Sequence, residues 1–235
     1  MDNLEVLYED NQIIVVKKPQ NVPSQADETG DEDMLTAVKR YIKVKYNKPG
    51  EVFCGLVHRL DRPTGGIMVF ARNSKSAMRL SEQIANNELE KTYFAVVCGN
   101  LPEKHGVLVN YLKKDEQNNI VRIVPQGEQG AKRAELEYYL LSKKDNLNLV
   151  LIKLKTGRGH QIRVQFANIK CPVYGDQKYG GSNMQKANLN LFAVELKFIH
   201  PTKKERMTFR CYPPETLTAW NQFDLEKFLN MHNVD

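Results

Sequence analysis

The alternation of apolar and polar residues along the chain predicts more strands than helices. Short runs of β-branched and aromatic residues, bounded by Asn, Asp, Gly or Pro, are typical of strands joined by tight turns. Such runs occur at residues 4–8, 12–17, 66–71, 90–97, 107–112, 120–124, 131–141, 148–156, 189–199 and 206–211. Many follow one another directly, so we expect an α+β fold with a large, mainly antiparallel mixed sheet flanked by helices.

Apolar residues at intervals of three and four predict four helices in addition to these strands. The helices are expected at residues 34–46, at residues 74–87, between Gly159 and Pro172, and at residues 216–231. Asn73 stands at the N-cap position of the second helix. The fourth helix is expected to be amphipathic through Leu217, Trp220, Leu225, Phe228 and Leu229. No repeat or low-complexity linker interrupts the chain, so we expect one continuous domain, residues 1–235.

Composition and charge narrow the possible functions. The 235 residues are 41% hydrophobic and 26% charged, which is ordinary for a soluble globular protein. A net charge of +6 and a pI near 9.0 favour a polyanionic partner, with nucleic acid first. The four cysteines are far apart, so neither a zinc site nor a disulfide framework is expected. The acidic N-terminal residues do not fit a signal peptide and no apolar run is long enough for a membrane, so we expect a cytoplasmic protein.

The stretch from Cys54 to Asn73 carries the strongest candidate chemistry. It reads C-G-L-V-H-R-L-D-R-P-T-G-G-I-M-V-F-A-R-N and holds Asp61 between Arg59 and Arg62. A Pro-Thr-Gly-Gly sequence before an apolar run is typical of a tight loop that leads into a buried strand. A carboxylate flanked by fixed positive charges tends to stay ionised even when partly buried, as a carboxylate nucleophile requires. An aspartate in a surface turn, paired with the neighbouring arginines, explains this stretch equally well.

Two further segments, Lys91-Thr92-Tyr93 and residues 156–163, supply a phenol and a guanidinium. If they converge with the Asp61 loop, the site contains one carboxylate, one phenol and one fixed guanidinium. The chain has no G-x-x-x-x-G-K-[ST] loop, and its short glycine pairs do not fit a dinucleotide site. The five histidines show no H-E-x-x-H spacing, so no metal is expected.

The three motifs together resemble the RluA family of RNA pseudouridine synthases. The segments H-R-L-D-R-P-T-G-G at 58–66, E-K-T-Y at 90–93 and T-G-R-G-H-Q-I-R at 156–163 have the order and separation of that family. The likeness spans nearly the whole chain, since it extends to Lys18-Pro19, Tyr174-Gly175-Asp176 and His200-Pro201. Two residues depart from the family pattern. These are Gly65, where serine is more frequent, and Gln165, where histidine is common.

The resemblance implies that uridine in RNA is isomerised to pseudouridine without a cofactor, by a domain of the pseudouridine synthase catalytic type. Asp61 matches the family's catalytic aspartate, which either adds covalently to the nucleoside or stabilises positive charge on the sugar. Arg163 matches the arginine that pairs with this aspartate and keeps it anionic in a dry pocket. Tyr93 matches the tyrosine that stacks on the uracil, although without the other motifs it would be an ordinary core tyrosine.

Other residues of the motifs are expected to bind the substrate or to brace the site. The target base must leave its stack, which costs roughly a few kcal/mol. Arg59 matches a family residue that fills the vacated space, with a surface ion pair as its alternative. His58, His160 and Gln161 are expected to brace the loops rather than to react. The candidate substrate-binding residues are Arg59, Ile162, His58, Arg62, Arg158, His160 and Gln161.

The expected partner is ribosomal or transfer RNA, bound by a monomer without an N-terminal domain of the ribosomal S4 type. Candidate phosphate contacts, each equally explained as a solvated charge cluster, are Lys39–Lys48, Lys113-Lys114, Lys132-Arg133 and Lys203-Lys204. Two other functions remain open. An RNA-binding or ribosome-associated module could keep the fold and lose activity, but the intact set of Asp61, Tyr93 and Arg163 argues against it. A base-removing glycosylase would leave free uracil.

Overall fold

The computed structural model describes residues 4–182, 184, 186–214 and 219–231. The chain forms two compact units. Unit 1 consists of residues 1–91 and 193–211, and unit 2 consists of residues 92–192 and 212–235. Each unit therefore combines segments that are distant in the sequence.

Unit 1 is built on strands that follow the predicted apolar runs. In the order of pairing these are β1 (Val6–Glu9), β2 (Ile13–Lys18), β4 (Gly65–Ala71) and β10 (Leu191–Ile199), with β3 (Gly55–Leu56) beside β4 and β11 (Arg206–Arg210) beside β10. The pairs β1·β2, β2·β4, β3·β4 and β10·β11 are antiparallel. Every residue of β4 is buried, as its unbroken apolar run indicates. The sequence does not predict β3, because two residues carry no periodicity.

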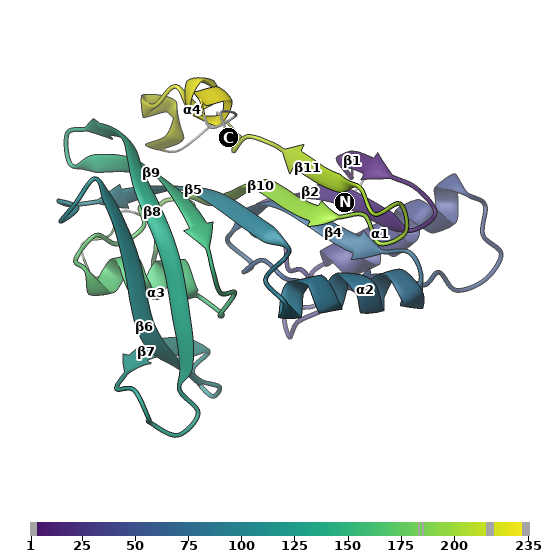
Figure 1. The fold of residues 1–235 in the computed structure, drawn as a ribbon, viewed down its shortest axis with the longest axis horizontal. Coiled ribbons are helices and arrows are strands. Elements are labelled where there is room, and N and C mark those ends of the chain that lie inside the picture. The colour runs from purple at the N-terminus through teal and green to yellow at the C-terminus, as the bar shows by residue number, and fades with distance from the viewer. Residues whose placement is uncertain (1–3, 183, 185, 215–218, 232–235) are drawn as a thin grey trace. The chain divides into compact units, whose positions relative to one another are not determined.

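Two helices accompany these strands in unit 1 (Figure 1). The first, α1, spans Met34–Lys45, and the second, α2, spans Ser74–Ala85. Asn73 caps α2 as expected, because its side chain accepts a hydrogen bond from the backbone N–H of Ser76. Asp33 caps α1 in the same way. Both predicted helices of this unit are confirmed, to within two residues at each end.

Unit 2 contains a second series of strands. In the order of pairing they are β5 (Glu90–Cys98), β9 (Leu147–Leu154), β8 (Lys132–Lys144), β6 (His105–Asp115) and β7 (Ile120–Val124). The pairs β8·β9, β6·β8 and β6·β7 are antiparallel. The predicted hairpin is present as β6 and β7, with Asn119 in a left-handed conformation (φ 49°) just before β7. Strand β5 is buried from Thr92 to Val97, as expected for a strand covered on both faces.

The helix α3 (Gln161–Asn168) packs against β6 and β8 within unit 2 (Figure 1). Tyr138 of β8 meets Phe166 of α3 edge to face, with ring centroids 5.5 Å apart. Gly106 of β6 makes room for this contact, because a Cβ there would lie 2.7 Å from the Tyr138 ring. All residues from 161 to 166 are buried, although only three of them are apolar. The helix therefore buries polar side chains as well as the predicted apolar stripe.

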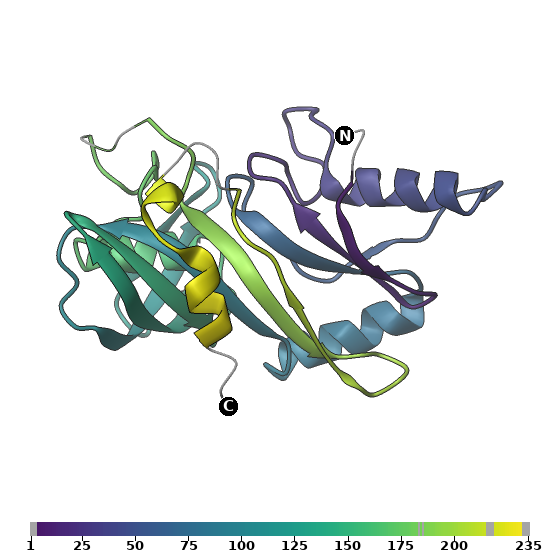
Figure 2. The same cartoon turned by 90° about the horizontal axis from the view of Figure 1, so that it is seen from above.

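The C-terminal segment differs from the predicted single helix. Residues 216–218 of that prediction lie outside the described residues. The remainder forms a 3-10 turn, η1 (Ala219–Gln222), and a separate helix, α4 (Leu225–Met231), which are the two short yellow coils in Figure 2. Asp224 lies between them and accepts a hydrogen bond from the N–H of Lys227. This side chain caps a new helix where the apolar spacing predicts continuation, so the prediction of one continuous helix is wrong.

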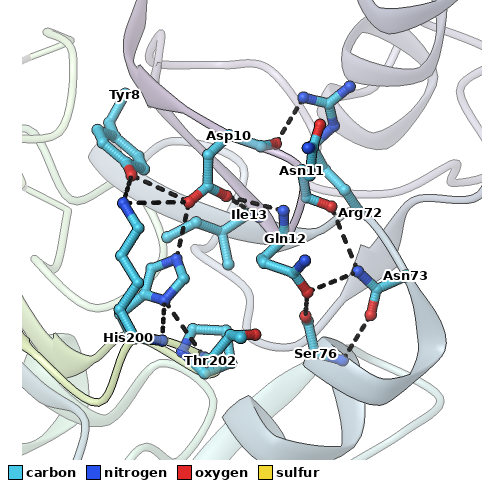
Figure 3. A network of polar contacts seen from close by, with 12 residues as sticks. Tyr8, Asp10, Asn11, Gln12, Ile13, Arg72, Asn73, Ser76, His200 and Thr202 are labelled. Carbon is cyan, nitrogen blue, oxygen red and sulfur yellow. Dashed lines mark hydrogen bonds and ion pairs between the residues drawn. The ribbon is translucent and has the colours of Figure 1, made fainter.

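A polar network in unit 1 ties the turn after β10 to the turn between β1 and β2 (Figure 3). The carboxylate of Asp10 accepts hydrogen bonds from the N–H groups of Gln12 (2.8 Å) and Ile13 (3.0 Å), the hydroxyl of Tyr8 (3.0 Å) and Nε2 of the buried His200 (2.9 Å). Nδ1 of His200 accepts from the N–H groups of residues 202 and 203. Nε2 therefore carries the proton that is donated to Asp10.

Asp10→Asn is expected to destabilise the protein by about 1–3 kcal/mol at neutral pH, because the amide NH2 would face N–H donors. Burial raises the pKa of Asp10, but its hydrogen bonds outweigh this effect and hold the pKa below the ordinary 3.8. The resulting stabilisation is complete above about pH 4 and is lost as the pH falls through the folded-state pKa. Chemical denaturation of both proteins down to about pH 3 checks this. The difference in unfolding free energy must shrink with acid, and a constant difference would contradict the role of the charge.

Candidate active site

Asp61 lies on a tight turn that leads into β4 of unit 1. The turn is closed by a hydrogen bond from the N–H of Thr64 to the carbonyl oxygen of Asp61 (2.9 Å), and Asp61 is half-buried. Gly66 follows with φ of 126°, and a Cβ there would lie 2.4 Å from the carbonyl oxygen of Ala193. Only glycine fits this position. The predicted tight loop into a buried strand is confirmed.

The side chain of Lys18, completely buried at the end of β2, supports this turn. Its ammonium group donates three hydrogen bonds, to the carbonyl oxygens of Pro19 (3.0 Å), Val22 (2.6 Å) and Arg62 (3.0 Å). Burial lowers the pKa of Lys18 to about 7, and the negative charge of Asp61 opposes this shift. A buried cation therefore connects β2 to the backbone of the Asp61 turn.

Ser24 and His58 fix the residues just before the turn. The hydroxyl of the buried Ser24 donates to the carbonyl oxygen of Leu60 (2.7 Å) and accepts from the N–H of the same residue (3.1 Å). Nε2 of His58 accepts from the N–H of Val69 in β4 (3.0 Å). Burial, together with the positive charge of Lys91, lowers the pKa of His58 to about 3. The His58 ring is therefore neutral and acts as an acceptor within the loop.

The two arginines that flank the candidate carboxylate lie in different surroundings. Arg59 is exposed. Arg62 is bound to an acidic segment of unit 1, with its Nη1 3.2 Å from Oδ2 of Asp27 and its Nη2 paired with Asp31. A phosphate group that binds Arg62 has to compete with these two carboxylates. The sequence pattern does not indicate this competition.

In unit 2, Gln161 ties the segment before α3 to β8. Its Oε1 accepts from the hydroxyl of Thr156 (2.8 Å) and from the N–H of Arg158 (3.0 Å). Its Nε2 donates to the carbonyl oxygen of Glu135 (3.0 Å). The side chain of Arg158 is exposed, and its Nε donates to the carbonyl oxygen of Arg133 (3.0 Å). The segment is thus held through its backbone, while the guanidinium of Arg158 lies at the surface.

The chain turns into α3 at His160. This residue has a left-handed backbone (φ 52°), a conformation that glycine adopts most easily, and neither Gly157 nor Gly159 has a positive φ. Nδ1 of His160 lies 2.7 Å from the hydroxyl of Tyr179, and this contact anchors the imidazole while the backbone turns. The glycines of the motif are therefore not the source of the turn.

Arg163 lies in the first turn of α3 and forms a buried ion pair with Asp176. Nε donates to Oδ2 (2.8 Å) and Nη2 to Oδ1 (2.7 Å), and the two side chains are 7% and 0% exposed. Ile162 is buried beside Arg163 in α3, and Tyr93 is buried in β5. A guanidinium has five N–H donors in a rigid fork, so the same group can bind a second carboxylate. Tyr93 and Arg163 belong to unit 2 and Asp61 to unit 1, so their convergence stays a prediction.

Several of the cations predicted to contact phosphate are paired with carboxylates in the structure. Exposed pairs of this kind are weak and are readily replaced by other anions. The pairs are Lys45 with Glu9, Lys113 with Glu128, Lys114 with Glu116, Arg133 with Glu135, and Lys203 with Asp10.

The described residues offer no obvious alternative chemistry. Among them, no group of three or more His, Cys, Asp and Glu side chains is arranged to hold a metal ion. The four cysteines are free thiols, and burial raises the pKa of Cys54 and of Cys211 to about 12. None of the helices in this part of the chain combines the length and apolar character that a membrane crossing requires.

Comparison with known proteins gives a consistent result. The family model described as RNA pseudouridylate synthase matches residues 12–168. An uncharacterized RNA pseudouridine synthase of Aquifex aeolicus is 35% identical over 92% of this chain and 71% of its own length. The tRNA pseudouridine synthase C of Vibrio parahaemolyticus is 31% identical over 93% of both chains, and ribosomal large subunit pseudouridine synthase D of Borreliella burgdorferi is 31% identical over 83% of this chain and 60% of its own.

Solved structures show the same fold. The human RNA pseudouridylate synthase domain containing 4 superposes with a TM-score of 0.75 at 23% identity, covering 89% of this chain and 88% of that one. The human RNA pseudouridylate synthase domain containing 1 gives a TM-score of 0.72 at 22% identity, covering 99% and 96%. These likenesses confirm the predicted α+β class with a large, mainly antiparallel mixed sheet.

These matches define an RNA-modifying isomerase. The chain belongs to the RNA pseudouridylate synthase family, in its RluA-type branch. The predicted membership and the predicted enzyme class, an RNA pseudouridine synthase, are confirmed.

Four residues that support these loops are not assigned a role by the sequence alone: Lys18, Ser24, Asp176 and Tyr179. In the sequence analysis, Lys18 and Asp176 are named only as members of segments that match the family. The burial of Lys18 could have been predicted, because strand alternation places it on the same face as Ile14 and Val16. The signal for Ser24 and Tyr179 is absent, since their partners lie far away in the sequence.

Lys18→Met is expected to destabilise the protein by about 1–3 kcal/mol, because three buried carbonyl groups lose their donor. Lys17→Met is a matched control one residue earlier. Lys17 is partly exposed and forms a 3.4 Å pair with the exposed Glu5, so its removal is expected to cost about 1 kcal/mol or less. Urea denaturation of the two variants measures the difference, and equal losses would contradict the structural role of Lys18.

The same variants carry a pH signature. The folded-state pKa of Lys18, about 7, lies below the ordinary value of 10.5. Between these values the unfolded chain binds more protons, so the wild-type protein gains stability as the pH rises from about 7 to about 10. Lys18→Met lacks this gain, and the stability difference from wild type must grow across the window. Parallel stability curves would show that the buried amine keeps an ordinary proton affinity.

Proposed function

We propose that Asp61 is the catalytic carboxylate with which this enzyme isomerises specific uridines in ribosomal or transfer RNA. The carboxylate adds to the nucleoside or stabilises positive charge on the sugar while the bond from N1 to the ribose is cut. The freed uracil turns and is rejoined to the sugar through C5. The proton lost from C5 is balanced by one taken up at N1, so the reaction needs no cofactor.

The observation that carries this proposal is the fixed position of the half-buried Asp61 on its turn. Lys18 and Ser24 hold the backbone on either side of Asp61, and Gly66 packs against the backbone of Ala193. These contacts act on the main chain, so the backbone that carries the carboxylate has its position before any substrate binds. Preorganisation of this kind is a main source of rate enhancement.

Arg163 and Tyr93 complete the proposed site. Arg163 pairs with Asp61 and keeps it ionised where water is excluded. Tyr93 stacks on the uracil and assists removal of the C5 proton. The burial of both side chains supports these roles, because a dry site needs a fixed cation and an aromatic wall.

The remaining motif residues bind or brace in this proposal. Arg59, which is exposed, fills the space left by the extruded base, and Ile162 lines the pocket beside it. Arg62 and Arg158 contact the RNA backbone. The side chains of His58, His160 and Gln161 are bound to Val69 of β4, to Tyr179 and to Glu135 of β8, which supports a bracing role.

Two relatives support the substrate class. One is named a ribosomal large subunit pseudouridine synthase and another a tRNA pseudouridine synthase. The net charge of +6 fits a polyanionic substrate. Four free thiols fit a reducing compartment, so we place the enzyme in the cytoplasm.

Asp61→Asn is expected to lower the rate of pseudouridine formation by at least about 1,000-fold, a loss of about 4 kcal/mol of transition-state stabilisation. The substitution keeps the shape of the side chain and removes its charge. The assay uses total RNA from a strain without the gene, labelled with tritium at uracil C5, and follows the release of label. Circular dichroism verifies that the variant is folded.

Asp10→Asn is the matched control, since it makes the same substitution in unit 1 outside the three motifs. It is expected to keep the wild-type rate at a temperature where it is folded. Near-wild-type turnover by Asp61→Asn would refute the assignment of the carboxylate. Release of free uracil instead of pseudouridine would identify a glycosylase.

A further inference from the structure

The loop at residues 174–181 of unit 2 places two side chains on Arg163. Asp176 binds one edge of the guanidinium, and the ring of Tyr179 lies against it. We propose that Asp176 is a positioning residue of the active site, which, together with Tyr179, fixes Arg163 in the orientation needed to hold Asp61. This inference rests on the proposed function, in which Arg163 pairs with Asp61.

The carboxylate of Asp176 is surrounded by donors. Oδ2 accepts from Nε of Arg163 at 2.8 Å, and Oδ1 accepts from Nη2 of Arg163 at 2.7 Å. Oδ1 also accepts from the N–H groups of Lys178 (3.0 Å) and Tyr179 (3.1 Å). The two backbone donors hold the carboxylate independently of Arg163. Asp176 is therefore a preformed acceptor with a bidentate geometry that suits only one orientation of a guanidinium.

The backbone of the loop is equally constrained. Gly175 has φ of 79°, and a Cβ there would lie 2.3 Å from the carbonyl oxygen of Asn188. A Cβ on Gly180 would lie 2.5 Å from the carbonyl oxygen of Asp176, which accepts the N–H of Gly180 at 2.8 Å. The N–H of Asp176 donates to the carbonyl oxygen of Val173 (3.1 Å). Backbone contacts on both sides thus set the position of Asp176.

Tyr179 restrains the same guanidinium from its face. Cζ of Arg163 lies 5.1 Å from the ring centroid, within the range of a cation–π contact. The Tyr179 hydroxyl accepts from the N–H of Val121 in β7 (2.9 Å) and lies 2.7 Å from Nδ1 of His160. The ring is therefore anchored at both β7 and the start of α3. With one partner at its edge and another at its face, Arg163 has little freedom to rotate.

Charge balance explains why a second acid is placed here. In the proposed site, Asp61 alone would neutralise Arg163, so Asp176 is not needed to compensate the guanidinium. Burying a further carboxylate costs desolvation energy, so its presence here points to a specific role. In the proposed site Arg163 therefore faces two carboxylates, and the role that this leaves to Asp176 is to orient the guanidinium.

Asp176→Asn is the test, in the tritium-release assay with C5-labelled total RNA. The variant is expected to lower kcat by about 10- to 100-fold, because a displaced guanidinium no longer holds the nucleophile in its reactive position. The KM for RNA is expected to change by less than about threefold, since the buried Asp176 offers almost no surface to the RNA. Tyr179→Leu removes the aromatic face together with the hydroxyl that contacts Val121 and His160, and is expected to lower kcat in the same direction by a smaller factor.

Asp10→Asn is the control for stability. It makes the same change in a carboxylate that also accepts four hydrogen bonds, and it is expected to lower the melting temperature without changing kcat. Unchanged kcat in folded Asp176→Asn would overturn the inference, as would a kcat loss that merely follows lost stability in both variants. If Asp176→Asn does not fold, unchanged kcat in Tyr179→Leu overturns it. Activity in Asp61→Asn would refute the proposed function itself, whereas inactive Asp61→Asn beside fully active Asp176→Asn refutes only the positioning role.

Discussion

The arrangement around Asp61 depends on one buried ammonium group. Moving a lysine out of water is costly unless acceptors and an opposite charge replace its hydration. For Lys18 the replacement consists of three carbonyl oxygens and the nearby charge of Asp61. One of these carbonyls belongs to Arg62, the residue directly after Asp61. Lys18 has all three carbonyl acceptors only when the turn has its observed shape. Any other shape would leave a buried ammonium group without an acceptor, so the cost of desolvating Lys18 favours the observed turn.

Unit 2 uses the same principle with a different cation. Arg163 lies in the first turn of a short helix whose side chains are buried on every face from residue 161 to 166. Its guanidinium is bound by Asp176, which is itself held by backbone N–H groups. In both units, then, a buried cation at the end of a secondary-structure element is fixed by a loop. Neither helix nor strand propensity accounts for these positions, because the stabilising partners come from other segments.

The sequence predicts features that depend on local signals. The apolar run of β4 and the N-cap at Asn73 appear where expected, because burial and capping are encoded within a few residues. The break before α4 was missed, since Leu225 and Phe228 keep helical spacing while Asp224 caps a new start. The partners of Arg62 were missed for a related reason. The sequence shows the neighbouring Asp61, whereas the carboxylates that bind Arg62 lie in another loop.

Residue 165, where the chain departs from the family pattern, lies in the core of unit 2, two residues after Arg163 in α3. Gln165 is completely buried, and its Nε2 donates to the carbonyl oxygen of Leu108 (3.1 Å) and to Oδ1 of Asn110 (2.8 Å) in β6. Residues two apart on a helix do not face each other, so the side chain of Gln165 contacts the sheet while that of Arg163 contacts Asp176. Because its amide NH2 donates to β6, Gln165 acts in packing rather than in proton transfer. Gln165 therefore helps to fix α3 on β6, and α3 carries Arg163.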